Sequence, residues 1–304
     1  MHIDLYIALA GLMVGFAVGL TGMGGGALMT PVLVIIFGVQ PLAAVSSDLV
    51  ASLLMKPLGA LVHVGKRTVQ WSLVRWLSLG SVPGALLGVT FLKLLGKGAT
   101  VQNVVQIALG SVLLLSVSAL TAKWLLDRRR GRLVSPDQSA PQPIKVRRLA
   151  TMGLGLAVGF IVGITATGSG TLIIVSLLLI YPQLRGSQTV GTDLTQAIPM
   201  VGAAALGHVL FGDFKLALTL SIVLGAIPGV LAGSIISSRS GTGLIRGALS
   251  IVLVLSGLKL VNVPTKAIGV VLAVALVSAA VVFVARRASV RTQPQVAGEL
   301  LEAS

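Results

Sequence analysis

Two aspartates lie inside long apolar stretches of the sequence, where an ionisable side chain is costly. Asp48 lies in an apolar run at 42–62, and Asp193 lies in a run at 187–210. Each is six residues into its run, a depth of about 9 Å along a helix. An ionisable group at that depth in a membrane is a functional candidate, here for binding protons. A helix cap or a contact between helices is the structural alternative.

Three basic side chains accompany these acids. Lys56 follows Asp48 by eight residues and has no basic counterpart in the second half of the chain, while His63 and His208 lie at the ends of apolar runs. The position of Lys56 favours snorkelling of its side chain to the inner surface, and that of the histidines favours interfacial hydrogen bonds. A part in proton coupling is the functional alternative for all three.

Two glycine-rich segments, at 22–26 and 168–170, are flanked by threonines. Glycines let the backbone bend at membrane depth and leave amides unpaired at the start of the following helix, where an anion is favoured. Close packing of helices through small residues is the alternative. The predicted substrate-binding residues are Thr21, Gly22, Gly24, Gly25, Gly26, Ser46, Ser47, Thr165, Thr167, Gly168, Ser169, Gly170 and Thr192.

The composition indicates that these residues belong to a membrane protein. Of the 304 residues, 55% are apolar and 10% are charged, and the mean hydropathy is +1.00. That leaves too little polar surface for soluble domains of this length. We therefore expect the lipid bilayer to surround the chain.

The basic residues are placed as in a multispanning membrane protein. A net charge of +15 would suit a nucleic-acid-binding protein, but eight of the 23 lysines and arginines lie between 123 and 148, in a break between apolar runs. This clustering is typical of cytoplasmic loops, so we exclude nucleic acid as a partner. With no cysteine in the chain, a thiolate metal site is excluded, and we expect no metal or other cofactor.

The apolar runs predict the elements that position these residues. Spanning a bilayer takes roughly 20 apolar residues. The stretches 5–37 and 149–181 are too long for one crossing and are broken by the glycine-rich segments. We predict an all-α polytopic membrane protein in which each half opens with a glycine-broken helix pair. Its predicted parts are a first membrane repeat (1–126), a basic cytoplasmic linker (127–148), a second membrane repeat (149–260), an additional transmembrane helix (261–285) and a cytoplasmic tail (286–304).

The two halves of the sequence resemble each other. Residues 14–28 align with 158–172 at an offset of 144, and beyond one inserted residue Asp48 aligns with Asp193 at an offset of 145. The same offset relates His63 to His208 and the segment 80–84 to 225–229. If the basic linker and tail are cytoplasmic, equivalent turns face opposite sides, as an inverted repeat requires. This topology places the N-terminus outside and makes 149–181 a hairpin that returns to its own side.

With these motifs the chain resembles the sulfite exporter TauE/SafE family of membrane permeases. The motifs are the glycine-rich break at 22–26 before Pro31, the cluster at 46–49, the His63-x-Gly65 turn and the segment 80–84, together with their second-half equivalents. The resemblance covers nearly the whole chain outside the linker and the tail. It implies transport of small sulfur-containing or carboxylate anions, such as sulfite or organosulfonates, coupled to an ion gradient across a bacterial cytoplasmic (inner) membrane. Many members have Ser or Thr where this chain has aspartates, which favours proton coupling here.

We therefore predict a secondary transporter, and not an enzyme, whose partners are a small anion, protons and the bilayer. A carboxylate repels an anion unless it is protonated, so proton and substrate either travel together or compete. An intramembrane aspartyl protease, which also uses two acids, is the alternative from another class. The segment 191–193 lacks the second glycine of its Gly-x-Gly-Asp pattern. A passive anion channel is the third possibility.

Overall fold

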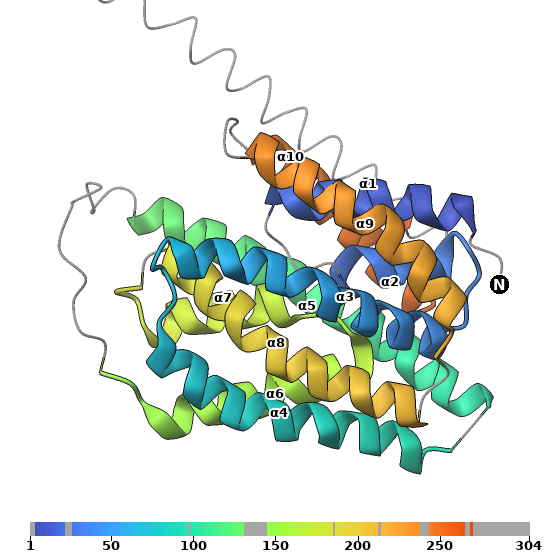
Figure 1. Cartoon of the computed structure of the whole chain (residues 1–304), viewed down its shortest axis with the longest axis horizontal. Helices are drawn as coiled ribbons and strands as arrows, with labels where there is room; N and C mark the ends of the chain where they lie inside the picture. Colours follow the sequence, from blue (N-terminus) through green and yellow to red (C-terminus); the bar gives the residue numbers. More distant parts are fainter. Residues whose placement is uncertain are drawn as a thin grey trace, which may run out of the picture. The chain divides into compact units, whose positions relative to one another are not determined.

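The structure is a computed structural model that describes residues 4–21, 26–96, 98–130, 145–184, 186–211, 214–237, 243–264 and 268–269. All regular secondary structure in these residues is helical. The helices are α1 (Leu5–Thr21), α2 (Gly26–Ile35), α3 (Pro41–Gly65), α4 (Trp71–Leu94), α5 (Ala99–Arg130), α6 (Arg148–Thr165), α7 (Ser169–Ile180), α8 (Gly186–Phe211), α9 (Leu216–Ser237) and α10 (Gly243–Leu260) (Figure 1). The predicted all-α fold and its two broken helix pairs, α1–α2 and α6–α7, are confirmed.

Six of the described helices are long and apolar enough to cross a bilayer. They are α3, α4, α5, α6, α8 and α9, whereas α1, α2, α7 and the end of α10 are shorter apolar helices. Many large apolar side chains on these helices, such as Leu54, Leu86 and Leu224, stay exposed. Because exposed leucines on so many faces would be unfavourable in water, this surface is suited to lipid.

Some predicted parts lie largely outside the described residues. The chain divides into one compact unit at residues 1–261 and a second at 262–304, and the second contains most of the predicted helix at 261–285 and all of the predicted tail at 286–304. Most of the predicted linker, at 131–144, is likewise outside. Helix α5 continues to Arg130, beyond residue 126, where the sequence placed the end of the first repeat.

The first unit is built around two long neighbouring helices, α3 and α8. These helices pack along each other, α4 packs against both α6 and α8, and α1 and α2 pack with α3 and α9 on the other side (Figure 1). Among the described residues, buried apolar side chains from α3 to α8 form the largest core cluster, which includes Leu49, Leu77, Ile173 and Met200.

Two glycine-lined contacts hold the outer helices to their neighbours. On α4, a side chain at Gly84 would collide with the Leu156 carbonyl oxygen of α6, and on α9 a side chain at Gly229 would collide with the Leu12 carbonyl oxygen of α1. Gly84 and Gly229 are related by the offset of 145 found in the sequence, and Leu12 and Leu156 by the offset of 144. Each of these two glycines thus lies at a contact between helices. Small residues are what allow helices to approach closely in lipid.

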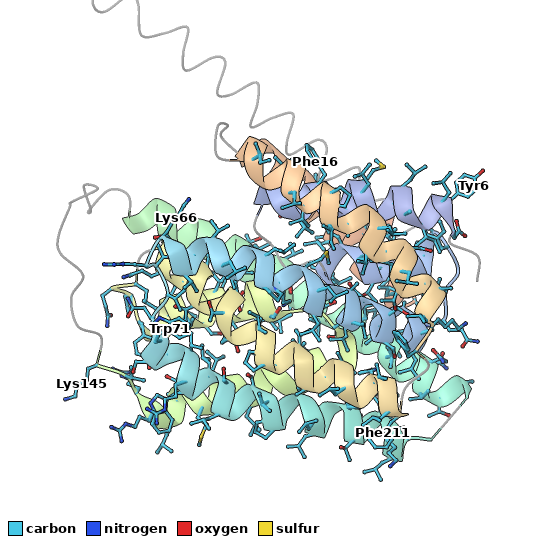
Figure 2. The ribbon with its side chains drawn as sticks, in the orientation of Figure 1. Tyr6, Phe16, Lys66, Trp71, Lys145 and Phe211 are labelled. Atoms are coloured by element: carbon cyan, nitrogen blue, oxygen red, sulfur yellow. The ribbon has the colours of Figure 1, made fainter. Side chains whose placement is uncertain are left out.

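The two ends of the helical bundle carry different residues. Lys66, Trp71 and Lys145 lie at one end, and Tyr6 and Phe211 lie at the other (Figure 2). Below, these are called the Lys66 end and the Phe211 end.

The α6–α7 pair begins and ends at the Lys66 end. The Tyr181 hydroxyl group, just after α7, lies 2.5 Å from the Thr151 hydroxyl oxygen and accepts a hydrogen bond from the Arg147 amide, just before α6, over 2.9 Å. Because its two termini meet in this way, the pair is a hairpin. The hairpin predicted at 149–181 is therefore present, and its return to the same side of the membrane stays a prediction.

Candidate functional site

The two broken helix pairs meet where α2 begins and α6 gives way to α7. The Thr167 hydroxyl group donates a hydrogen bond to the Gly26 carbonyl oxygen over 2.8 Å. A side chain on Gly26 would collide with the Ala166 carbonyl oxygen, so the close approach requires glycine. The structure therefore brings Gly26 together with the second break. The predicted contributions of the Thr21 side chain and of residues 22–25 lie outside the described part of the chain.

The α6–α7 break presents the start of a helix inside the bundle. Between Thr165 and Ser169 the backbone φ angles of Ala166 and Gly168 are 57° and 105°, a left-handed geometry that ends α6 and redirects the chain. Gly168 occupies the N-cap position of α7 and has no side chain to bond the first amides. Amides in the first turn of a helix have no partner within that helix, so the start of α7, at buried Ser169 and Gly170, favours an anion.

Lys56 points to this helix start. Its Nζ atom donates a hydrogen bond to the Ser169 Oγ atom over 2.8 Å, and the side chain is half-buried. Snorkelling to the inner surface, which the sequence favoured, is therefore wrong. Helical side chains lean toward the N-terminus of their helix. Because α3 runs from the Phe211 end to the Lys66 end (Figure 2), this lean carries the ammonium group into the bundle.

Asp48 lies on α3 beside the start of α2. It is fully buried and accepts a hydrogen bond of 2.5 Å from the Thr30 hydroxyl group of α2. A longer one, of 3.5 Å, comes from the Ser52 hydroxyl group one helical turn further along α3. The adjacent Ser47 hydroxyl group is buried and has no hydrogen-bond partner among the residues that the structure describes. Asp48 is thus held by neutral donors.

Asp193 is buried on α8 in a different setting. Gln196, three residues further on, donates a 3.4 Å hydrogen bond to the carboxylate, and Ser81 of α4 donates one of 3.2 Å to the Gln196 side-chain oxygen. Lys56 interacts electrostatically with both Asp193 and Asp48. Lys56 is therefore the cation that interacts with two acids, Asp48 of α3 and Asp193 of α8.

The two acids are not paired as in an aspartyl protease. In the described part of the chain, the hydrogen bonds that reach Asp48 and Asp193 come from neutral side chains, and none joins the two carboxylates. A catalytic dyad requires carboxylates that share a proton. Among the residues that the structure describes, no cluster of three or more histidine or acidic side chains is placed to hold a metal ion.

The two candidate histidines differ in their surroundings. His208 is buried, with its Nδ1 atom 2.8 Å from the Ser46 hydroxyl oxygen of α3. Its Nε2 atom donates to the Gly163 carbonyl oxygen of α6 over 2.8 Å. His63 is half-buried and contacts the Thr68 hydroxyl group at 2.9 Å, just after its own helix. His208 thus joins three helices, whereas His63 bonds locally.

Thr192 lies apart from the meeting point of the helix pairs. Its hydroxyl oxygen accepts a hydrogen bond from the Gln70 amide over 3.1 Å, immediately before α4 begins at Trp71. Thr165, by contrast, is at the break, where its hydroxyl group bonds to the Thr167 carbonyl oxygen over 3.2 Å. The predicted hydroxyl groups therefore do not form one cluster.

Two polar contacts of the acids were missed by sequence reasoning. Thr30 contacts Asp48 from a neighbouring helix, and only its polar character within an apolar run could have drawn attention to it. Gln196 lies three residues after Asp193, a spacing that places the two side chains on the same helix face. That spacing was a usable signal.

A cavity of about 840 Å³ opens at the Phe211 end and reaches His208. Polar side chains on its wall include Gln40, Gln102 and Lys93. Lys93 also lies over the Phe211 ring, with its Nζ atom 3.9 Å from the ring centroid. His208, which contacts Ser46 of α3, is a polar link between this cavity wall and the α3 helix.

Comparison with known proteins agrees with the membrane-spanning helices and the polar interior. The family model for the sulfite exporter TauE/SafE matches residues 7–260. The chain is 36% identical over 256 residues to the probable membrane transporter protein YjnA of Bacillus subtilis (strain 168), covering 84% of this chain and 98% of that protein. It is 24% identical over 268 residues to the probable membrane transporter protein YunE of the same organism, covering 84% and 96%. No solved structure matches the chain.

These findings define the class of the protein as a multi-pass membrane transporter and not an enzyme. More particularly, the chain belongs to the sulfite exporter TauE/SafE family.

Proposed function

We propose that this protein is a secondary carrier of small anions, with sulfite, organosulfonates and related sulfur-containing or carboxylate anions as its substrates, and that transport is coupled to protons. The observation that carries the proposal is the contact of Lys56 with the first residue of α7, within electrostatic reach of Asp48 and Asp193. A cation, a helix start and two acids inside a membrane-spanning bundle suit an anion whose binding depends on protons.

The anion-binding part of the site consists of positive partial and full charges. The first-turn amides of α7 favour a negative ligand, and the hydroxyl groups of Thr165, Thr167 and Ser169 lie at the same break. Backbone that is not helical at membrane depth is tolerated where it lines a cavity or packs within the protein. A small oxyanion would replace the water that such groups otherwise bind.

The two acids supply the coupling. An ionised carboxylate near the site repels an anion, and protonation removes that repulsion, so proton binding and anion binding favour each other. A carrier built in this way moves the two together. In a bacterial cytoplasmic membrane, with the basic Lys66 end inside, an inward proton gradient would then drive uptake, and an outward substrate gradient would drive export with protons.

Transport by purified protein in proteoliposomes tests this proposal. Radiolabelled sulfite, methanesulfonate and acetate should be offered in turn, each with and without an imposed pH gradient. We expect at least one sulfur-containing anion to accumulate against its own gradient when the side containing that anion is more acidic. A proton ionophore should abolish the accumulation.

The same measurement separates the carrier from its rivals. A passive channel would equilibrate the anion but never accumulate it when the membrane potential is clamped at zero. The absence of transport for every anion tested, by folded protein in sealed vesicles, would contradict the proposed function.

A further inference from the structure

Lys56 has hydrogen-bonding capacity that the described residues do not use. An ammonium group has three donors, and the structure gives Lys56 one partner, the neutral Ser169 hydroxyl group. In the described part of the chain its ammonium group forms no ion pair within salt-bridge distance, although Asp48 and Asp193 both interact with it electrostatically. Placing a charged ammonium group inside a membrane-spanning bundle costs free energy unless an opposite charge pairs with it. The unused donors of Lys56 therefore indicate a negatively charged ligand.

The surroundings of Lys56 combine one positive and two negative groups. Among the described residues, the ionisable groups that interact with Lys56 are Asp48 on its own helix and Asp193 on α8. Helix α7 contributes a hydroxyl group and the start of a helix. With both aspartates ionised, the three side chains of Lys56, Asp48 and Asp193 carry a net negative charge. Protonation of one aspartate makes their net charge zero, so an anion gains access to Lys56 as the aspartates take up protons.

Resting on the proposed function, we propose that Lys56 is the cationic contact of the transported anion, which binds between its ammonium group and the first turn of α7. A small oxyanion with several oxygens on one centre, such as a sulfonate, sulfite or carboxylate, can accept from the ammonium group, the Ser169 hydroxyl group and the α7 amides at once. The position aligned with Lys56 in the second half is Val201, so the second repeat supplies no equivalent cation.

The chain offers a direct test because it contains no cysteine. Lys56→Cys creates a single thiol, which can be modified before reconstitution with a methanethiosulfonate reagent that carries either an ammonium group or a neutral methyl group. Both products derive from the same folded protein. We expect the KM for the transported probe, methanesulfonate or sulfite, to be at least tenfold lower with the ammonium adduct than with the neutral adduct.

Simple substitutions provide a second measurement. Lys56→Gln should raise the KM at least tenfold, whereas Lys56→Arg, which keeps the charge, should stay within threefold of the unmodified protein. Lys145→Gln is the matched control, because it removes one positive charge at an exposed position outside the site. A structural role for Lys56 would lower the amount of folded protein and would leave the KM of the folded fraction unchanged.

Two results would overturn the inference: equal KM values for the charged and neutral adducts, or a Lys56→Gln protein with an unchanged KM. Either result, obtained with a wild-type protein that transports the probe, would contradict the role of Lys56 alone. Failure of the wild-type protein to transport any anion would contradict the proposed function itself.

Discussion

Asp48 and Asp193 occupy matching positions in the two halves of the chain but have different hydrogen-bond partners. Asp48 accepts from two hydroxyl groups, those of Thr30 and Ser52, whereas Asp193 accepts from the Gln196 amide. Two donors stabilise a negative charge more than one does. If transport is coupled to protons as proposed, we therefore predict that Asp193 carries the larger share of proton exchange.

Replacing the acids by asparagine tests this assignment. Asparagine keeps the size and hydrogen-bonding ability of aspartate but cannot exchange a proton. We expect Asp193→Asn to retain exchange of labelled anion across the vesicle membrane, to lose the dependence of exchange on pH, and to reduce gradient-driven accumulation to the level measured without a gradient. Asp48→Asn should cause smaller changes in the pH dependence of exchange and in gradient-driven accumulation.

Unaltered gradient-driven transport by both folded variants would contradict proton coupling through these two acids and would indicate that their role is structural. Asn substitution at Asp137, in the predicted linker, serves as the control for loss of one acid elsewhere in the chain.

At the scale of elements, the glycine-lined contacts of α4 with α6 and of α9 with α1 define how closely the helices pack. Gly84 and Gly229 each lie against a backbone carbonyl oxygen of the neighbouring helix. At Gly153, on α6, no described atom beyond the helix's own nearby backbone and the two adjacent residues lies within 4 Å of the position that its Cβ would take. Substitutions at these three glycines therefore distinguish the effect of steric overlap with a neighbouring helix from the effect of glycine on helix propensity.

Alanine at Gly84 or Gly229 should destabilise the protein by about 1–3 kcal/mol, the usual cost of overpacking, because backbone cannot move aside as a side-chain end can. Gly153→Ala should be neutral or should stabilise by up to about 1 kcal/mol, the difference in helix propensity. Thermal unfolding in detergent, followed by circular dichroism, measures both effects. Equal melting temperatures for all three variants would contradict the role of these glycines in packing.

At the scale of the whole molecule, the two ends of the bundle are not equivalent. The cavity opens at the Phe211 end, whereas at the Lys66 end Thr192 bonds the start of α8 to the residue before α4. Exposed basic residues gather at the Lys66 end, among them Arg67, Lys145 and Arg148. From the positive-inside rule we predict that the Lys66 end is cytoplasmic and that the cavity faces outside.

Single cysteines test this orientation without interference, because the chain has none of its own. A cysteine in place of Lys145, exposed before α6, should react with a membrane-impermeant thiol reagent only after the cells are opened. A cysteine in place of Ala99, on the cavity wall, should react in intact cells. The reverse pattern would invert the topology.

Much of the fold could be predicted from the sequence, because crossing a bilayer imposes a length and an apolar composition that can be counted along the chain. The glycine-rich segments indicated where the two long stretches break, and the basic residues indicated that 149–181 returns to its own side. The sequence alone also singled out Asp48, Asp193 and the histidines, because an ionisable group in an apolar run is conspicuous.

Which of these residues meet was decided only by the tertiary structure. Lys56 bonds to Ser169, 113 residues away in the chain, and Asp48 bonds to Thr30 on another helix, whereas Thr192 is separated from the break where its hydroxyl group was expected to act. Composition and spacing determine the face and depth of a side chain. The packing of α3 against α2, α8 and α9 determines its neighbours, because the direction of a long side chain such as that of Lys56 depends on where the adjacent helices leave room.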